Sequence, residues 1–304
     1  MSNIVTNVKN LELETIKNLK NSKAHNTLRA YQADFGDFSN FCKTNNFNSL
    51  PTDPKIVALY LTHLSSSCKF STLKRRLASI NVIHKLKGHY IDTKHPIISE
   101  NLMGIKRKLG VKQISKKPIL LNDLKLIIQA ITDEKNEFKK IQNKALILIG
   151  FAGGFRRSEL VSIDYDDVDF VNEGVKINIK KSKTDQIGIG MVKAIPYFEN
   201  TKFCPVVSLK EWINYAKINS GRIFKISDKS VALIIKKYAL ISGLDHSKYA
   251  GHSLRSGFAT STAETGADER SIMAMTGHKT TQMVRRYIQE ANLFKNNALN
   301  KIKI

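Results

Sequence analysis

The chain has 304 residues, 42% of them hydrophobic, so it is long enough for two domains with cores of their own and is not a disordered protein. Its 49 Lys and Arg outnumber its 26 Asp and Glu and give a formal net charge of +23. A surface this basic attracts polyanions, and nucleic acid is the leading candidate partner. A lysine-rich surface that only keeps the protein in solution is the alternative.

Several classes of protein are disfavoured by composition. Cys42, Cys68 and Cys204 are scattered and form no C-x-x-C pair, which argues against a disulfide framework or a zinc site and favours a reducing compartment. The N-terminus lacks the apolar core of a signal peptide. The longest apolar run, residues 145–155, is far shorter than the roughly 20 residues that span a bilayer. We therefore expect a cytoplasmic protein with no membrane partner and no structural metal.

The first part of the chain has the apolar spacing of packed helices. Asp53 followed by Pro54 is typical of an N-cap and a first helical turn. Apolar residues recur at helical spacing in the flanking segments as well. Further helices are expected at residues 27–42, from Ser71 or Thr72 onward, and at 98–109 before Gly110.

Charge is concentrated in this first part. Residues 1–117 carry 20 basic and 7 acidic residues, whereas residues 118–304 carry 29 and 19. This density of positive charge suits a domain that clamps the phosphate backbone of DNA. Its affinity for DNA is expected to fall steeply as the salt concentration rises. We expect this part to hold DNA from one side and the remainder to hold it from the other. The expected DNA contacts are Arg29, Ser71 and the outward-facing Lys74, Arg75 and Arg76.

The second part mixes helices with a small sheet. Residues 111–117 show no periodicity and precede Pro118, so a linker is placed at 113–117. Alternating Val175, Ile177 and Ile179 predict a strand, with a turn at 181–190 and a return strand at 191–195. Helices are expected at 122–131 with Asn122 as cap, 140–151, 157–163, 206–218, 229–241, 252–265, 268–276 and 281–299. The predicted fold class is mainly α with a small β-sheet.

Four short motifs in this second part indicate phosphate chemistry. They are Gly154–Leu160 with Arg156 and Glu159, Ser182–Asp185 with Lys183, Gly251–Arg255 with His252, and Gly277-His278 nine residues before Tyr287. A tyrosine hydroxyl is neutral at pH 7, since its ordinary pKa is about 10, so a tyrosine nucleophile needs a proton acceptor and cations around the phosphate. Arginine supplies a permanent charge and a planar fork that matches two phosphate oxygens.

Each choice among neighbouring residues has an ordinary structural alternative. Arg156 is preferred to Arg157 because Glu159 lies one helical turn away and can hold its side chain, although exposed Arg–Glu helix pairs are common. Lys183 shares its turn with Lys180 and with Lys181, which is the alternative candidate, and a charge run is usually a solvated face. Tyr287 fits an apolar stripe and a core role, but its position after two arginines and beyond His278 favours a nucleophile.

Read in order, these motifs resemble the tyrosine recombinase (phage integrase) family, and the resemblance covers nearly the whole chain. The helix start at residues 26–29 and the stretch 71–84 are similar to Cre-like members. The chain as a whole resembles a Cre-like or XerC/XerD-like site-specific recombinase. The resemblance implies a helical, SAM-like core-binding domain at 1–112 and a catalytic domain at 118–292. It also implies that the tail at 293–304, with apolar Ala298, Leu299, Ile302 and Ile304, packs on a neighbouring protomer.

The resemblance further implies a role for each residue. Tyr287 attacks a DNA phosphate to form a 3′-phosphotyrosyl link, while two arginines, Arg156 and Arg255, bind the phosphate. The remaining roles are proton transfer at the tyrosine by His252, a hydrogen bond to a nonbridging oxygen from His278, and protonation of the leaving 5′-oxygen by Lys183. The family needs no metal or cofactor. It works through a Holliday junction as four protomers on two DNA duplexes, and the protomers are expected to associate weakly without DNA.

Two other functions fit some of the same residues. A type IB topoisomerase uses similar groups to relax supercoils as a monomer, and a catalytically inactive relative would serve as a DNA-binding accessory protein. The spacings Arg-x-x-Glu, His-x-x-Arg and Gly-His-x(8)-Tyr favour a site-specific recombinase.

Overall fold

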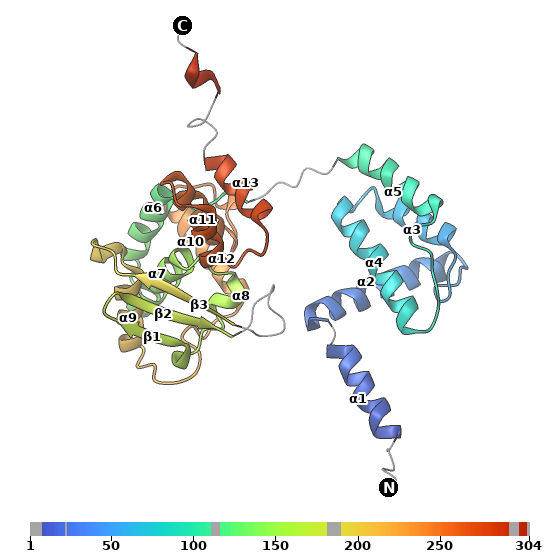
Figure 1. Ribbon diagram of the computed structural model, residues 1–304, viewed down its shortest axis with the longest axis horizontal. Helices are drawn as coiled ribbons and strands as arrows, with labels where there is room; N and C mark the ends of the chain where they lie inside the picture. The colour runs from blue at the N-terminus through green and yellow to red at the C-terminus, as the bar shows by residue number, and fades with distance from the viewer. Residues whose placement is uncertain (1–7, 22, 111–115, 181–189, 292–297, 303–304) are drawn as a thin grey trace. The chain divides into compact units, whose positions relative to one another are not determined.

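A computed structural model describes residues 8–21, 23–110, 116–180, 190–291 and 298–302. The chain divides into two compact units, residues 1–114 and 115–304 (Figure 1). Residues 113–115 of the predicted linker lie outside the described residues, and the predicted domain limits of 112 and 118 remain predictions.

The first unit is helical, as the sequence predicts. Its helices are α1 (Val8–Asn21), α2 (His25–Thr44), α3 (Pro54–Leu64), α4 (Phe70–Leu86) and α5 (Pro96–Leu109). Asp53 caps α3 as expected, because its carboxylate accepts a hydrogen bond from the backbone N–H of Lys55 at 2.7 Å. Apolar faces of α2 to α5 meet in one core that includes Phe38, Leu61, Leu73, Ile80 and Ile98. Helix α1 has no counterpart among the predicted elements.

The second unit surrounds a larger core with helices and one sheet. Its helices are α6 (Leu121–Thr132), α7 (Glu137–Ala152), α8 (Arg157–Leu160), α9 (Pro205–Tyr215), α10 (Asp228–Ile241), α11 (Ser253–Glu264), α12 (Glu269–Thr276) and α13 (Thr281–Ala291). Short 3-10 turns lie at Tyr165–Asp167, Thr201–Phe203, His246–Lys248 and Ala298–Lys301. The prediction of a mainly α fold with a small sheet is confirmed. Among the described residues no helix is both long and apolar enough to cross a bilayer.

The sheet has three antiparallel strands in the order β1 (Val168–Val171), β2 (Gly174–Ile179) and β3 (Met191–Pro196). Strand β2 alternates as predicted, with Val175, Ile177 and Ile179 buried. On β3 the inward positions are Ile195, opposite Val175, and Lys193, opposite Ile177. A lysine therefore occupies an inner position of the sheet where the neighbouring strand places isoleucine. Strand β1 was not predicted.

Several helix limits differ from the predictions, as at α6, α8 and α13. Helix α6 begins at Leu121 because Leu120 is extended and its carbonyl already accepts from the N–H of Leu124, so Asn122 lies inside the first turn and is not the cap. Helix α8 ends at Leu160, before the predicted residue 163. The last long helix, α13, ends at Ala291 and not at 299.

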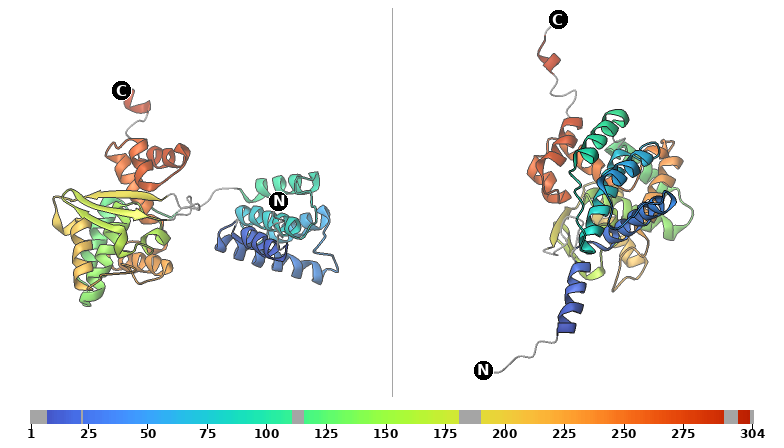
Figure 2. Two further views of the ribbon diagram at one scale, coloured as in Figure 1. Left: turned by 60° about the horizontal axis from the view of Figure 1, so that its bottom comes forward. Right: turned by 90° about the vertical axis from the view of Figure 1, so that its right-hand side faces the viewer.

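Helices α11, α12 and α13 form a separate small bundle within the second unit, drawn in orange and red beyond the strands in Figures 1 and 2. Their shared core contains Ala259, Ala263, Ile272 and Val284. Between α12 and α13, Gly277 adopts the left-handed φ of +63° that ends α12, as its position after Thr276 predicts. This bundle carries four of the predicted site residues, namely His252 and Arg255 at the start of α11, His278 after α12 and Tyr287 on α13.

Candidate active site

Arg156 and Glu159 form a hydrogen-bonded ion pair in the site. Arg156 stands at the N-cap of α8, and its Nη1 donates to Oε1 of Glu159 at 2.6 Å. The other carboxylate oxygen accepts from the backbone N–H of Arg156 at 2.9 Å. Glu159 is only 3% exposed, so this carboxylate is held firmly in place. The predicted contact is present, and it orients the guanidinium of Arg156.

The neighbouring Arg157 is engaged elsewhere. Its side chain passes over Gly251, where an added Cβ would lie 1.7 Å from Cδ of Arg157. Its Nη2 lies 3.6 Å from a carboxylate oxygen of Asp228. The glycine that opens the Gly-His-x-x-Arg motif therefore serves to admit Arg157, and Arg156 is left as the arginine of the site.

Arg255 lies one turn into α11 and is 3% exposed. Its Nη1 donates to the carbonyl of Gly154 at 2.9 Å. Its Nη2 is buried and has no hydrogen-bond partner among the described residues. Burial, assisted by the positive charge of Arg156, lowers the pKa of Arg255 to about 10, which leaves it charged at neutral pH. A buried cationic N–H group without an acceptor is costly, so this arrangement favours an anionic ligand.

His278 follows Gly277 and is 7% exposed. Its Nδ1 lies 2.8 Å from Oγ1 of Thr276, which itself lies 2.6 Å from the carbonyl of Ile272. The single hydroxyl hydrogen of Thr276 must point to that carbonyl, since two oxygen lone pairs would otherwise face each other. The Thr276 oxygen therefore accepts, and Nδ1 of His278 carries the proton.

The protonation state of His278 follows from its surroundings. Burial, together with the charges of Arg255 and Arg156, lowers its pKa to about 4. The ring is therefore neutral at pH 7, and its Nε2 is an acceptor. Donation of a hydrogen bond to a phosphate oxygen, the role expected from the resemblance, requires a second proton on this ring. A bound anion would favour that proton.

Tyr287 lies on α13 beside His278, with the two ring centroids 6.1 Å apart and the ring planes at 33°. Its half-buried ring also packs against the small core that contains Val284. The ring packs in the bundle and also lies beside His278, so its position fits a core role and leaves the role of nucleophile a prediction. The charge of the tyrosinate form acts on Arg255 and raises the pKa of that guanidinium.

The last two catalytic candidates are His252 and Lys183. His252 occupies the N-cap position of α11 and is exposed, whereas Arg255, three residues on, is buried. Lys183 and its alternative Lys181 lie outside the described residues. The structure thus brings together Arg156, Glu159, Arg255, His278 and Tyr287, which come from α8, α11, α13 and the turn after α12.

One buried residue near the site was missed. Lys193 on β3 is 1% exposed, and its Nζ donates to the carbonyl of Gly153 at 2.6 Å and to the carbonyl of Met275. The alternation of β3 offered a signal for it, because a strand that points Ile195 inward also points Lys193 inward.

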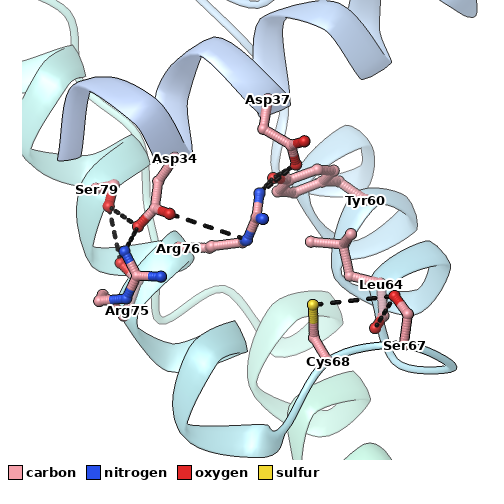
Figure 3. Close-up of polar contacts among 9 residues, drawn as sticks. All are labelled: Asp34, Asp37, Tyr60, Leu64, Ser67, Cys68, Arg75, Arg76 and Ser79. Atoms are coloured by element: carbon pink, nitrogen blue, oxygen red, sulfur yellow. Dashed lines mark hydrogen bonds and ion pairs between the residues drawn. The ribbon is translucent and has the colours of Figure 1, made fainter. Parts of the chain in front are cut away.

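In the first unit, two of the predicted DNA contacts are paired with acids of α2 (Figure 3). Nη1 of Arg75 lies 2.5 Å from Asp34, which also accepts from Ser79. Arg76 pairs with Asp37 and lies over the ring of Tyr60. The predicted outward position of Arg76 is wrong, because these partners hold its side chain at 17% exposure. The remaining candidates, Arg29, Ser71 and Lys74, are exposed.

Comparison with known proteins identifies the family of this chain. The sequence profile of the Phage integrase family matches residues 119–293, more than half of the chain. An integrase/recombinase xerD homolog of Selenomonas ruminantium is 41% identical over 313 residues, which cover 98% of this chain and 91% of the relative. A tyrosine recombinase XerC of Thermodesulfovibrio yellowstonii is 25% identical, with coverages of 89% and 88%.

Two solved structures share the fold. A XerH site-specific recombinase bound to its difH substrate has a TM-score of 0.61 at 18% identity and covers 81% of this chain and 73% of its own. A lambda integrase dimer bound to a core site has a TM-score of 0.58 at 14% identity, with coverages of 99% and 81%. The profile match and the relative at 41% identity agree with the order of the site motifs, so this chain belongs to the phage integrase family and is a tyrosine recombinase.

Proposed function

We propose that this site-specific recombinase cuts and rejoins DNA through a covalent bond between Tyr287 and a 3′-phosphate. The observation that carries the proposal is the buried Arg255, whose Nη2 has no partner among the described residues, in a site that also contains Arg156, His278 and Tyr287. Double-stranded DNA is the substrate that the net charge of +23 favours. The solved structures of the XerH recombinase and of lambda integrase are complexes with DNA sites.

The chemistry balances without external energy. The hydroxyl oxygen of Tyr287 forms a bond to phosphorus as the bond from phosphorus to the 5′-oxygen breaks. The tyrosine proton passes toward His252, and Lys183 supplies a proton to the leaving 5′-oxygen. The two arginines stabilise the charge that gathers on the nonbridging oxygens, each contributing about 3 kcal/mol in the transition state. Attack by a second 5′-hydroxyl on the phosphotyrosine reverses the step and joins a new strand.

The assembly that we propose contains four protomers on two duplexes and passes through a Holliday junction. A direct test incubates the protein with two labelled duplexes taken from the DNA on either side of its gene and chosen for inverted repeats about a short spacer. Recombinant strands and four-way junctions are expected. Relaxation of supercoiled plasmid without any exchange of strands would instead indicate an enzyme of the type IB topoisomerase class.

For the first unit we propose that Lys74 contacts a DNA phosphate, whereas Arg76 supports the fold. Lys74→Ala should lower affinity for DNA and reduce the slope of log K against log salt by about 1. Arg76→Ala leaves Asp37 and the hydroxyl of Tyr60 without their cation and should cost roughly 1–3 kcal/mol of unfolding free energy. DNA binding at graded salt and urea denaturation of both variants measure the difference. A Lys74→Ala protein with an unchanged salt slope contradicts the proposed contact.

The tail at residues 293–304 is proposed to pack on a neighbouring protomer. Leu299 and Ile302 are 68% and 58% exposed, although both are large and apolar. Deletion of 293–304 should therefore leave cleavage of a single nicked site largely intact and impair recombination between two sites. Both rates are read on gels from the same preparation. Equal recombination by the full-length and shortened proteins would refute trans packing.

A further inference from the structure

We propose that Lys193 is a positioning residue of the active site, which ties the turn before Arg156 to the end of the helix before His278. This inference rests on the proposed function of the site. The two carbonyls that its Nζ contacts belong to Gly153, after the end of α7, and Met275, in the last turn of α12. These segments are separated by more than a hundred residues in the sequence, and one buried ammonium joins them.

The turn that Lys193 holds contacts one arginine of the site and leads along the chain to the other. Its neighbour Gly154 accepts the hydrogen bond from Arg255, and the turn leads through Phe155 to Arg156. The ring of Phe155 lies 4.7 Å from Nζ of Lys193, a cation–π contact. The turn is tightly packed, since an added Cβ on Gly153 would lie 2.1 Å from that ring. A shift of this turn would therefore displace both phosphate-binding side chains together.

In its ammonium form, Lys193 adds a third positive charge near Arg156 and Arg255. The charged groups that act on it are Glu159 from α8, Arg156 from the start of that helix, and Arg255 from α11. Burial, together with the two arginines, lowers the pKa of Lys193 to about 7, while Glu159 opposes the shift. The charge of Lys193 in turn lowers the pKa of His278. An anionic phosphate between the arginines would favour the ammonium form of Lys193 and so strengthen both of its hydrogen bonds.

The test compares Lys193→Met with the native protein in preformed complexes with nicked DNA, measuring the rate of covalent adduct. Adduct formation should slow by roughly 10- to 100-fold because the arginines lose their alignment, with DNA affinity changed by less than about threefold. The same comparison uses DNA with a methylphosphonate at the scissile position. There the loss should shrink to about threefold or less, since the neutral centre has less need of aligned cations. A general packing defect would slow both substrates equally.

Two further variants keep the result decisive. Lys176→Met, on an exposed position of β2, removes a lysine from the same sheet and should react at the native rate. Lys193→Gln keeps two N–H donors without the charge and should fall between the native protein and Lys193→Met; it replaces the methionine variant if that one does not fold. A Lys193 variant that reacts within threefold of the native rate, or that is slowed equally on both substrates, overturns the inference. Failure of the native protein to form any adduct would instead overturn the proposed function.

The pH dependence of the unfolding free energy supplies an independent test of the burial of Lys193. Since the pKa of Lys193 in the folded protein is about 7 and its ordinary value is 10.5, the unfolded chain binds more protons between these limits. Stability of the native protein should therefore rise with pH from 7 to 10 relative to Lys193→Met. A difference in unfolding free energy between the two proteins that does not change across this range would show that burial does not lower the pKa of this amine, and would contradict the burial on which the inference rests.

Discussion

Tyr287→Phe is expected to abolish covalent attachment to DNA while leaving folding and DNA binding intact. The substitution keeps the ring, which packs against the core of α11 to α13, and removes the attacking oxygen. No other group in the proposed scheme replaces that oxygen, so adduct should fall below detection. Denaturing gels with labelled suicide substrate measure the adduct, and gel shifts measure binding.

The matched control for this variant is Tyr215→Phe, which removes the hydroxyl of an exposed tyrosine at the end of α9, distant in sequence from every motif of the site. It should form adduct at the native rate. EDTA should also have little effect on the native protein, because arginines carry the phosphate charge in this mechanism. Adduct formation by Tyr287→Phe, or a strict requirement for magnesium, contradicts the assignment of the nucleophile.

Replacing the bridging 5′-oxygen with sulfur should distinguish the role of Lys183 from that of Arg156, because the two residues act on different oxygens of the phosphate. A 5′-alkoxide is a poor leaving group that needs a proton, whereas a thiolate leaves without one. Lys183→Ala should therefore cleave ordinary DNA slowly and cleave the sulfur substrate at nearly the native rate. Arg156→Ala should be slower by roughly 100- to 1000-fold on both substrates, because its charge acts on the nonbridging oxygens.

Lys181→Ala is the matched control for the lysine. If sulfur rescues Lys181→Ala and leaves Lys183→Ala slow, Lys181 is the general acid. If neither variant is rescued, both lysines only bind phosphate and the general acid lies elsewhere.

Glu159→Gln tests the support of Arg156 in the same assay. It should lower the rate on both substrates, because the neutral amide holds the guanidinium less firmly than the carboxylate does.

Local sequence patterns were sufficient for most of the fold. Helical periodicity and recognisable caps such as Asp53 predicted the helices, and the alternation of Val175, Ile177 and Ile179 predicted β2. Helix limits were less predictable where no side-chain cap marks the start, as at Leu120. These are properties of short segments, which the order of the residues largely determines.

Properties set by distant partners could not be predicted in this way. Arg76 has the position of an outward residue on α4, but Asp37 on another helix draws it inward. The proton on Nδ1 of His278 depends on where the hydroxyl of Thr276 points, and Lys193 is recognisable as part of the site only once Gly153 and Met275 lie beside it. The site motifs predict the reacting groups, whereas the fold determines how those groups are held and protonated.

The central claim is tested most directly by mapping the covalent adduct. The native protein is trapped on a suicide duplex carrying its site, digested with protease and nuclease, and analysed by mass spectrometry. The account predicts one modified peptide, with a 3′-linked nucleotide phosphate on the hydroxyl of Tyr287. A phosphate bonded to any other residue, or attached through the 5′ end of the broken strand, would contradict it.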